Sequence, residues 1–66
     1  MITDIKAHLE SSQFIPFSIE MNDGRSIRVL SRDHIGVLIQ AVAVEDDAGA
    51  VRILAARNIS GLTPNP

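Results

Sequence analysis

Two short alternating segments on either side of a glycine-containing turn constrain this chain more than any other feature. Apolar and polar residues alternate through Phe17–Met21 and again through Ser26–Val29, which is typical of β-strands with one buried face. A two-residue turn would mix the two faces, whereas a three-residue turn at Asn22–Gly24 keeps each apolar set together. We therefore predict an antiparallel hairpin with Ile19 opposite Ile27 and a left-handed turn glycine.

An amphipathic helix is expected before the hairpin, over about residues 3–12. Ile2, Ile5 and Leu9 recur at helical spacing, and Thr3 is a residue type that caps a helix N-terminus. A helix of this length is marginal by itself in water, so its apolar stripe must dock onto the strands.

Three further strands are expected after the hairpin. The segment Ile35–Val44 contains a single polar residue, Gln40, and we interpret it as one strand that is covered on both faces. The next strand, Val51–Ala55, alternates with Leu54 on its more polar side. One helical turn at Ala55–Asn58 then leads to a last strand at Ile59–Leu62.

The fold class that follows is mainly β with one N-terminal α-helix. We predict a small, strongly bent, five-stranded antiparallel barrel over about residues 17–62, with a tail at 63–66. The whole chain, residues 1–66, forms a single domain, because a second core would not fit in this length.

The chain is short for a stable domain. A domain of about 60 residues buries only about 60% of the surface that its unfolded chain exposes. The sequence has no cysteine for a disulfide, and its two histidines are too few for a structural metal site. We expect no metal and no cofactor. Because oligomerisation is the remaining means of stabilisation, and 45% of the residues are hydrophobic, we expect a homo-oligomer.

Composition and motif spacing argue against three classes of function. No base, nucleophile and orienting group can be assembled, so we predict no enzyme and no catalytic residues. The longest apolar segment is far shorter than the roughly 20 residues that span a bilayer, and no signal peptide is visible, so we expect a cytoplasmic protein with no membrane partner. The net charge of −2 argues against nonspecific nucleic-acid binding.

The order of the expected elements resembles the Sm-like family. Residues 22–35, NDGRSIRVLSRDHI, look like the family's first motif, and residues 57–62, RNISGL, are similar to its second. The resemblance implies subunits that join through edge strands into a ring, whose two loops bind uridine-rich RNA. It implies an RNA-binding site with arginine on phosphate and asparagine on base edges. The residues would be Arg32, Asp33, His34, Arg57 and Asn58.

An alternative hypothesis involves no nucleic acid. The stretch Ile15–Ile19 followed by Asp23–Arg25 also resembles a group of short bacterial proteins of unknown function. The chain has only two aromatic residues, Phe14 and Phe17, whereas proteins that bind single strands stack bases on aromatic side chains. The chain would then be a protein-interaction or assembly module that pairs a partner strand with the Ile35–Val44 segment or its exposed edge.

Overall fold

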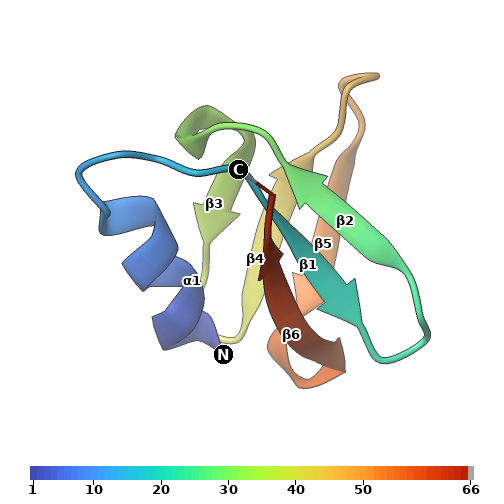
Figure 1. Ribbon diagram of the computed structural model, residues 1–66. Coiled ribbons are helices and arrows are strands. Elements are labelled where there is room, and N and C mark those ends of the chain that lie inside the picture. Colours follow the sequence, from blue (N-terminus) through green and yellow to red (C-terminus); the bar gives the residue numbers. More distant parts are fainter. Residues whose placement is uncertain (66) are drawn as a thin grey trace.

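In the computed structural model, which describes residues 1–65, one helix lies beside two small β-sheets (Figure 1). The elements are α1 (Ile2–Glu10), β1 (Phe17–Met21), β2 (Ser26–Val29), β3 (Ile35–Val37), β4 (Ala41–Glu45), β5 (Val51–Ala55) and β6 (Ile59–Pro64). Single turns of 3₁₀ helix, η1 (Arg32–His34) and η2 (Ala56–Asn58), precede β3 and β6. The strand orders are β2-β1-β6 and β3-β4-β5, and all neighbouring strands are antiparallel.

The predicted five-stranded barrel is wrong, although the mainly β composition with one N-terminal helix is confirmed. Six strands form two separate three-stranded sheets that do not close into a barrel. The extra strand arises because Ile35–Val44 is a hairpin: Val37 pairs with Val42, and Leu38 N donates to Ala41 O at 2.9 Å. The reversal was not visible in the sequence because the turn residues 38–40 include none of the types that usually mark turns.

The hairpin of β1 and β2 has the predicted register. Ile19 pairs with Ile27 and Phe17 with Val29. Met21 N donates to Arg25 O at 2.8 Å, which closes a three-residue turn, and Gly24 has a φ of 92°. The alternating pattern and the turn glycine were therefore sufficient to define this part of the fold.

Replacing Gly24 with alanine should lower the free energy of unfolding by about 1 kcal/mol, because a residue with a Cβ is strained in the left-handed region. Gly36→Ala is the matched control, since open space surrounds that position and its φ is not positive. Urea denaturation of both variants checks this, and equal losses of stability would contradict the assigned turn.

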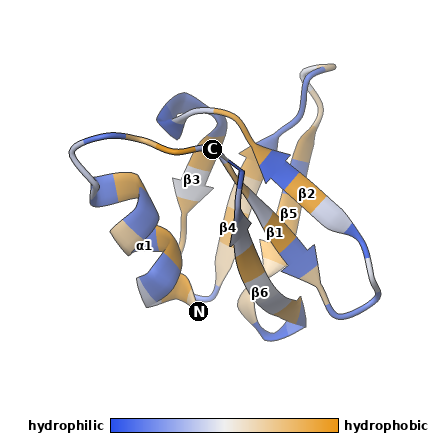
Figure 2. Cartoon of the chain, in the orientation of Figure 1, coloured by the Kyte–Doolittle hydropathy of each residue, from blue (hydrophilic) through white to orange (hydrophobic). Residues whose placement is uncertain are grey.

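The hydrophobic core lies between the two sheets and α1. The helix docks through Ile5, which is fully buried, and Ile2 and Leu9 pack against the core beside it. Hydrophilic and hydrophobic residues alternate along β2, whereas most of β4 is apolar (Figure 2). The buried residues are Ile5, Phe17, Ile19, Met21, Ile27, Val29, Val42, Val44, Leu54 and Ile59.

The ends of the chain differ in detail from the prediction. The helix begins at Ile2 with Met1 as its N-cap residue and no side-chain cap, so the predicted cap at Thr3 is wrong. The helical turn before the last strand is confirmed as η2. Part of the predicted tail is strand, because β6 extends to Pro64 and Asn65 N donates to Pro16 O at 2.7 Å. Pro66 lies outside the described residues. Within residues 1–65, no helix has the length and apolar character needed to cross a bilayer.

Candidate interaction surface

The five predicted RNA-binding residues fall into two groups. Arg32, Asp33 and His34 form η1, whereas Arg57 and Asn58 lie in η2. In Figure 1, the turn before β3 is at the top of the molecule and the turn before β6 is at the bottom. Within one chain, the structure therefore brings together the members of each group but does not join the two groups in one surface.

Arg32 ties the end of α1 to the rest of the molecule. Its Nε donates to Leu9 O at 2.9 Å, and its Nη2 donates to Ser11 O. The guanidinium also lies 5.5 Å from the centre of the Phe14 ring. These contacts satisfy carbonyl groups that the last turn of a helix leaves without intrahelical partners. Arg32 thus has a structural role that the sequence motif did not indicate.

Replacing Arg32 with alanine should lower the free energy of unfolding by about 1 kcal/mol, through the loss of hydrogen bonds from a charged donor at an exposed site. Arg57→Ala is the control, because the Arg57 side chain has no hydrogen bond or ion pair among the described residues. Thermal unfolding of the two variants checks the difference. A loss of equal size in both would show that Arg32 is not a tether.

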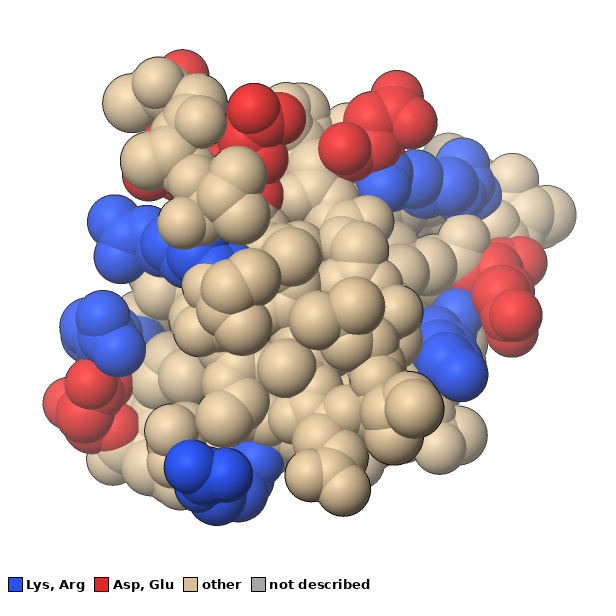
Figure 3. All heavy atoms as spheres, turned by 180° about the vertical axis from the view of Figure 1, so that it is seen from behind, with Lys and Arg blue, Asp and Glu red and all other residues tan. Residues whose placement is uncertain are grey.

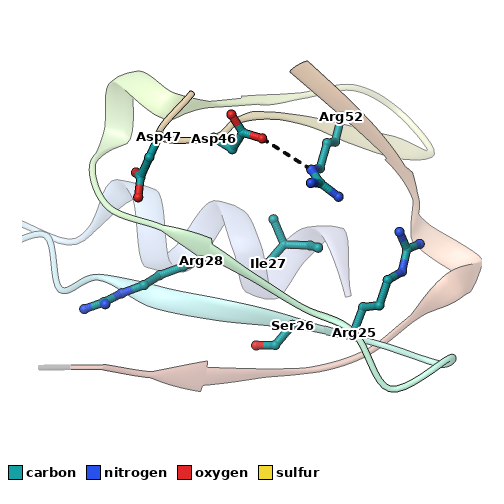
Figure 4. A pocket seen from close by; sticks show the side chains of 7 residues that line it. All are labelled: Arg25, Ser26, Ile27, Arg28, Asp46, Asp47 and Arg52. Carbon is teal, nitrogen blue, oxygen red and sulfur yellow. Dashed lines mark ion pairs between the residues drawn. The ribbon is translucent and has the colours of Figure 1, made fainter. Parts of the chain in front are cut away.

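A cleft of about 320 Å³ between β2 and the β4–β5 turn carries charges of both signs. In Figure 4, Ile27 lies at its centre, and the Asp46–Arg52 pair lies across from Arg25. The distance from Arg52 Nε to Asp46 Oδ2 is 3.7 Å, and that from Arg25 Nε to Asp23 Oδ2 is 2.8 Å. Because carboxylates balance these arginines, the cleft does not have the excess of positive charge that attracts a polyanion.

The two aspartates that pair with arginine mainly stabilise turns. The backbone N–H of Ala50 holds the pKa of Asp46 below its usual value, and the N–H of Ala48 and the Arg52 guanidinium act in the same direction. The backbone N–H of Arg25 likewise lowers the pKa of Asp23. Both carboxylates thus accept hydrogen bonds from the backbone of their own turns. For Asp46, this explains structurally why an acidic residue lies in the turn before β5.

The outer face of the β3–β4–β5 sheet is the strongest candidate for a binding surface. Seen from behind, this side of the molecule is a broad uncharged area with charged residues around its margin (Figure 3). Val51 and Ile53 are each 63% exposed. Monomeric proteins rarely expose large contiguous apolar patches, so this face is a candidate interaction site. We define the outer face by the apolar residues that point away from the core: Gly36, Ala41, Ala43, Val51, Ile53 and Ala55.

The assignment of Val51 and Ile53 to this face corrects the sequence interpretation of β5. Leu54, placed on the polar side of the strand, is in fact 5% exposed and lies opposite the buried Val42. The register with β4 decides which side of β5 faces the core. The alternation alone is ambiguous, because large apolar residues lie on both sides of the strand, Val51 and Ile53 on one and Leu54 on the other.

Three of the four edge strands have features that discourage pairing with another chain. β2 exposes the charged Arg28. β6 contains a register shift and ends in Pro64, which has no amide hydrogen to donate. β3 has only three residues and lies next to α1 in Figure 1. The fourth edge strand, β5, also carries a charged residue, Arg52, but this side chain lies 3.7 Å from Asp46. Its outer flank carries the exposed apolar residues Val51 and Ile53, and it contains no proline.

The free edge of β5 presents the backbone groups of its odd-numbered residues. Asp46 N donates to Ala50 O at 2.9 Å and Ala56 N donates to Gln40 O at 2.8 Å, so the even-numbered residues of β5 bond to β4. In an antiparallel ladder the alternate residues point their N–H and C=O groups the other way. Val51, Ile53 and Ala55 therefore offer their backbone groups at the edge and their side chains on the outer face.

Two further observations bear on function. Within residues 1–65, no group of three histidine, aspartate or glutamate side chains is placed to hold a metal ion. Comparisons with protein-family models, with curated proteins and with solved structures gave no match to this chain. Its function is therefore inferred from the surface that the fold exposes.

Proposed function

We propose that this chain is a protein-interaction module that accepts an extended strand of a partner protein at the edge of β5. The observation that carries the proposal is that β5 is an edge strand whose exposed side chains, Val51 and Ile53, border an apolar face. In this mode of recognition, backbone hydrogen bonds supply affinity, and the side chains at alternate positions of the added strand supply specificity.

The surroundings of β5 define the chemistry of the strand that fits. Every second side chain of an added strand would lie on the outer face, beside Val51 and Ile53, which favours apolar residues at those positions. The intervening side chains would lie on the side of Arg52, which is 3.7 Å from Asp46 and half-exposed. We expect a polar or acidic residue there.

The same features support a protein partner over the RNA that the Sm-like resemblance implies. The outer face has no aromatic side chain for stacking, and its apolar residues do not attract phosphate. Arg32, the first of the predicted RNA-binding residues, donates to the carbonyl groups at the end of α1.

Selection from a library of random heptapeptides displayed on phage tests this proposal. Against the immobilised protein, we expect enrichment of peptides with apolar residues at alternate positions. Their binding should shift the NMR signals of β5 and the outer face. Ile53→Lys should abolish this binding, because it places a charge at the centre of the edge.

Ile39→Lys is the matched control, since Ile39 is 90% exposed but lies in the β3–β4 turn, outside β5. This variant should bind the selected peptides as the unmodified protein does. Enriched peptides that shift signals elsewhere, or the absence of any enrichment on protein that is monomeric at the concentration used, would contradict a strand-binding site at β5.

A further inference from the structure

We infer that the strand accepted at β5 is β5 of a second copy of this chain, in a two-fold antiparallel arrangement centred on Ile53. The inference rests on the proposed function, since it concerns the same edge, and it adds the identity of the partner and the register of the pairing.

The free backbone groups of two copies match in this arrangement. With Ile53 opposite Ile53 of the second copy, Val51 lies opposite Ala55 of that copy. All three residues point their N–H and C=O groups out of the sheet, as the β4–β5 ladder requires. Each opposing pair can therefore exchange two hydrogen bonds, and the two sheets join into one sheet of six strands.

The charge of Arg52 determines which residue of β5 lies on the two-fold axis of the pairing. Pairing centred on Ile53 sets Arg52 opposite Leu54 of the second copy, whereas pairing centred on Arg52 would place two guanidinium groups directly opposite each other. Like charges in that position destabilise a sheet. Pairing centred on Leu54 avoids this repulsion but leaves Val51 without a partner, so the register at Ile53 is the most favourable of the three.

The two ends of β5 are complementary in charge. The turn before the strand contains Asp46 and Asp47, next to Glu45 at the end of β4, and the η2 turn after the strand contains Arg57. Antiparallel pairing brings the acidic turn of each copy beside η2 of the other copy. Asp47 and Arg57 are exposed, and neither forms an ion pair among the described residues, so both are free to interact across the interface.

Pairing also supplies the stabilisation that a chain of this size needs. The joined sheet has a continuous outer face of twice the extent, and a second pair can cover it by stacking face to face. We therefore expect assemblies of two or four chains.

Single introduced cysteines test the register, because the chain has none of its own. Ile53→Cys should form a disulfide-linked dimer under mild oxidation, since directly opposed residues of a hydrogen-bonded pair have Cα atoms about 5.5 Å apart. Val51→Cys is the matched control, because Val51 lies on the same face and is equally exposed. It should not cross-link, since the two copies of Val51 would be about 13 Å apart along the sheet. Efficient cross-linking of Val51→Cys would overturn the register.

Sedimentation velocity over a dilution series tests the assembly without any cross-link. The unmodified protein should sediment as two or four chains of 7.1 kDa at high concentration. Ile53→Lys should raise the dissociation constant at least roughly tenfold, because two lysines would oppose each other at the centre. Ile39→Lys should not change it.

A monomer at every concentration, or an assembly that Ile53→Lys leaves intact, would overturn the inference. The peptide selection then separates the two proposals. If peptides still bind at β5, only the identity of the partner is wrong. If no peptide binds there, the proposed function fails as well.

Discussion

Replacement of Phe17 with alanine is expected to leave the chain largely unfolded at room temperature. Phe17 is fully buried in β1, and its ring stacks on His8 at 4.9 Å and lies 6.1 Å from Phe14. Truncating a buried phenylalanine costs about 3–5 kcal/mol. The core of a domain this small rarely supplies more than about 3–5 kcal/mol, so the loss is comparable to the whole stability.

Circular dichroism during urea denaturation measures this effect. Phe17→Leu is the control, because it retains most of the buried volume and should still unfold cooperatively. If Phe17→Ala unfolded within about 1 kcal/mol of the unmodified protein, Phe17 would not be the central core residue.

The second large effect is expected for Ile5→Ala, which removes the anchor of α1. Ile5 is the one residue of this helix whose side chain is buried. Truncating a buried isoleucine costs about 2–5 kcal/mol, and a helix of nine residues is unstable without its packing. We expect α1 to detach while the two sheets remain folded.

Amide exchange followed by NMR distinguishes this local loss from global unfolding. Amides of α1 should exchange much faster in Ile5→Ala, whereas those of β1 and β4 should stay protected. Thr3→Ala should leave exchange unchanged, since no side chain caps this helix. Equal acceleration in the helix and the strands would show that α1 is not a separate unit.

The sequence determined the parts of the fold that depend on neighbouring residues. In the β1–β2 hairpin, strict alternation and Gly24 specify both the register and the turn, and the structure confirms them. The Ile35–Val44 segment lacks such signals, so its division into β3 and β4 depends on how the two strands pack against the core. That division, together with the open arrangement of the sheets, is why the predicted barrel is wrong.

The strand that we propose for pairing differs from the one in the sequence hypothesis. The sequence hypothesis put strand pairing at Ile35–Val44 or its edge, and β3 of this segment is an edge strand, whereas the edge that we propose for pairing is β5. Which side of β5 is buried depends on its pairing with β4, where Leu54 lies opposite Val42. The pairing with β4 determines which side chains of β5 are buried, and the alternation within β5 does not determine it. The structural role of Arg32 was also not visible in the sequence, where the motif indicated RNA binding. Its hydrogen bond to Leu9 O joins residues that are 23 positions apart in the chain.

The concentration dependence of amide exchange in β5 is the most direct test of the account. In dilute solution, the amides of Val51 and Ile53 should exchange rapidly, because they point out of the sheet. The amides of Arg52 and Leu54, which face β4, should be protected. As the concentration rises, Val51 and Ile53 should become protected while Arg52 and Leu54 change little. Exchange at Val51 and Ile53 that stays rapid at every concentration would contradict pairing between two copies at this edge.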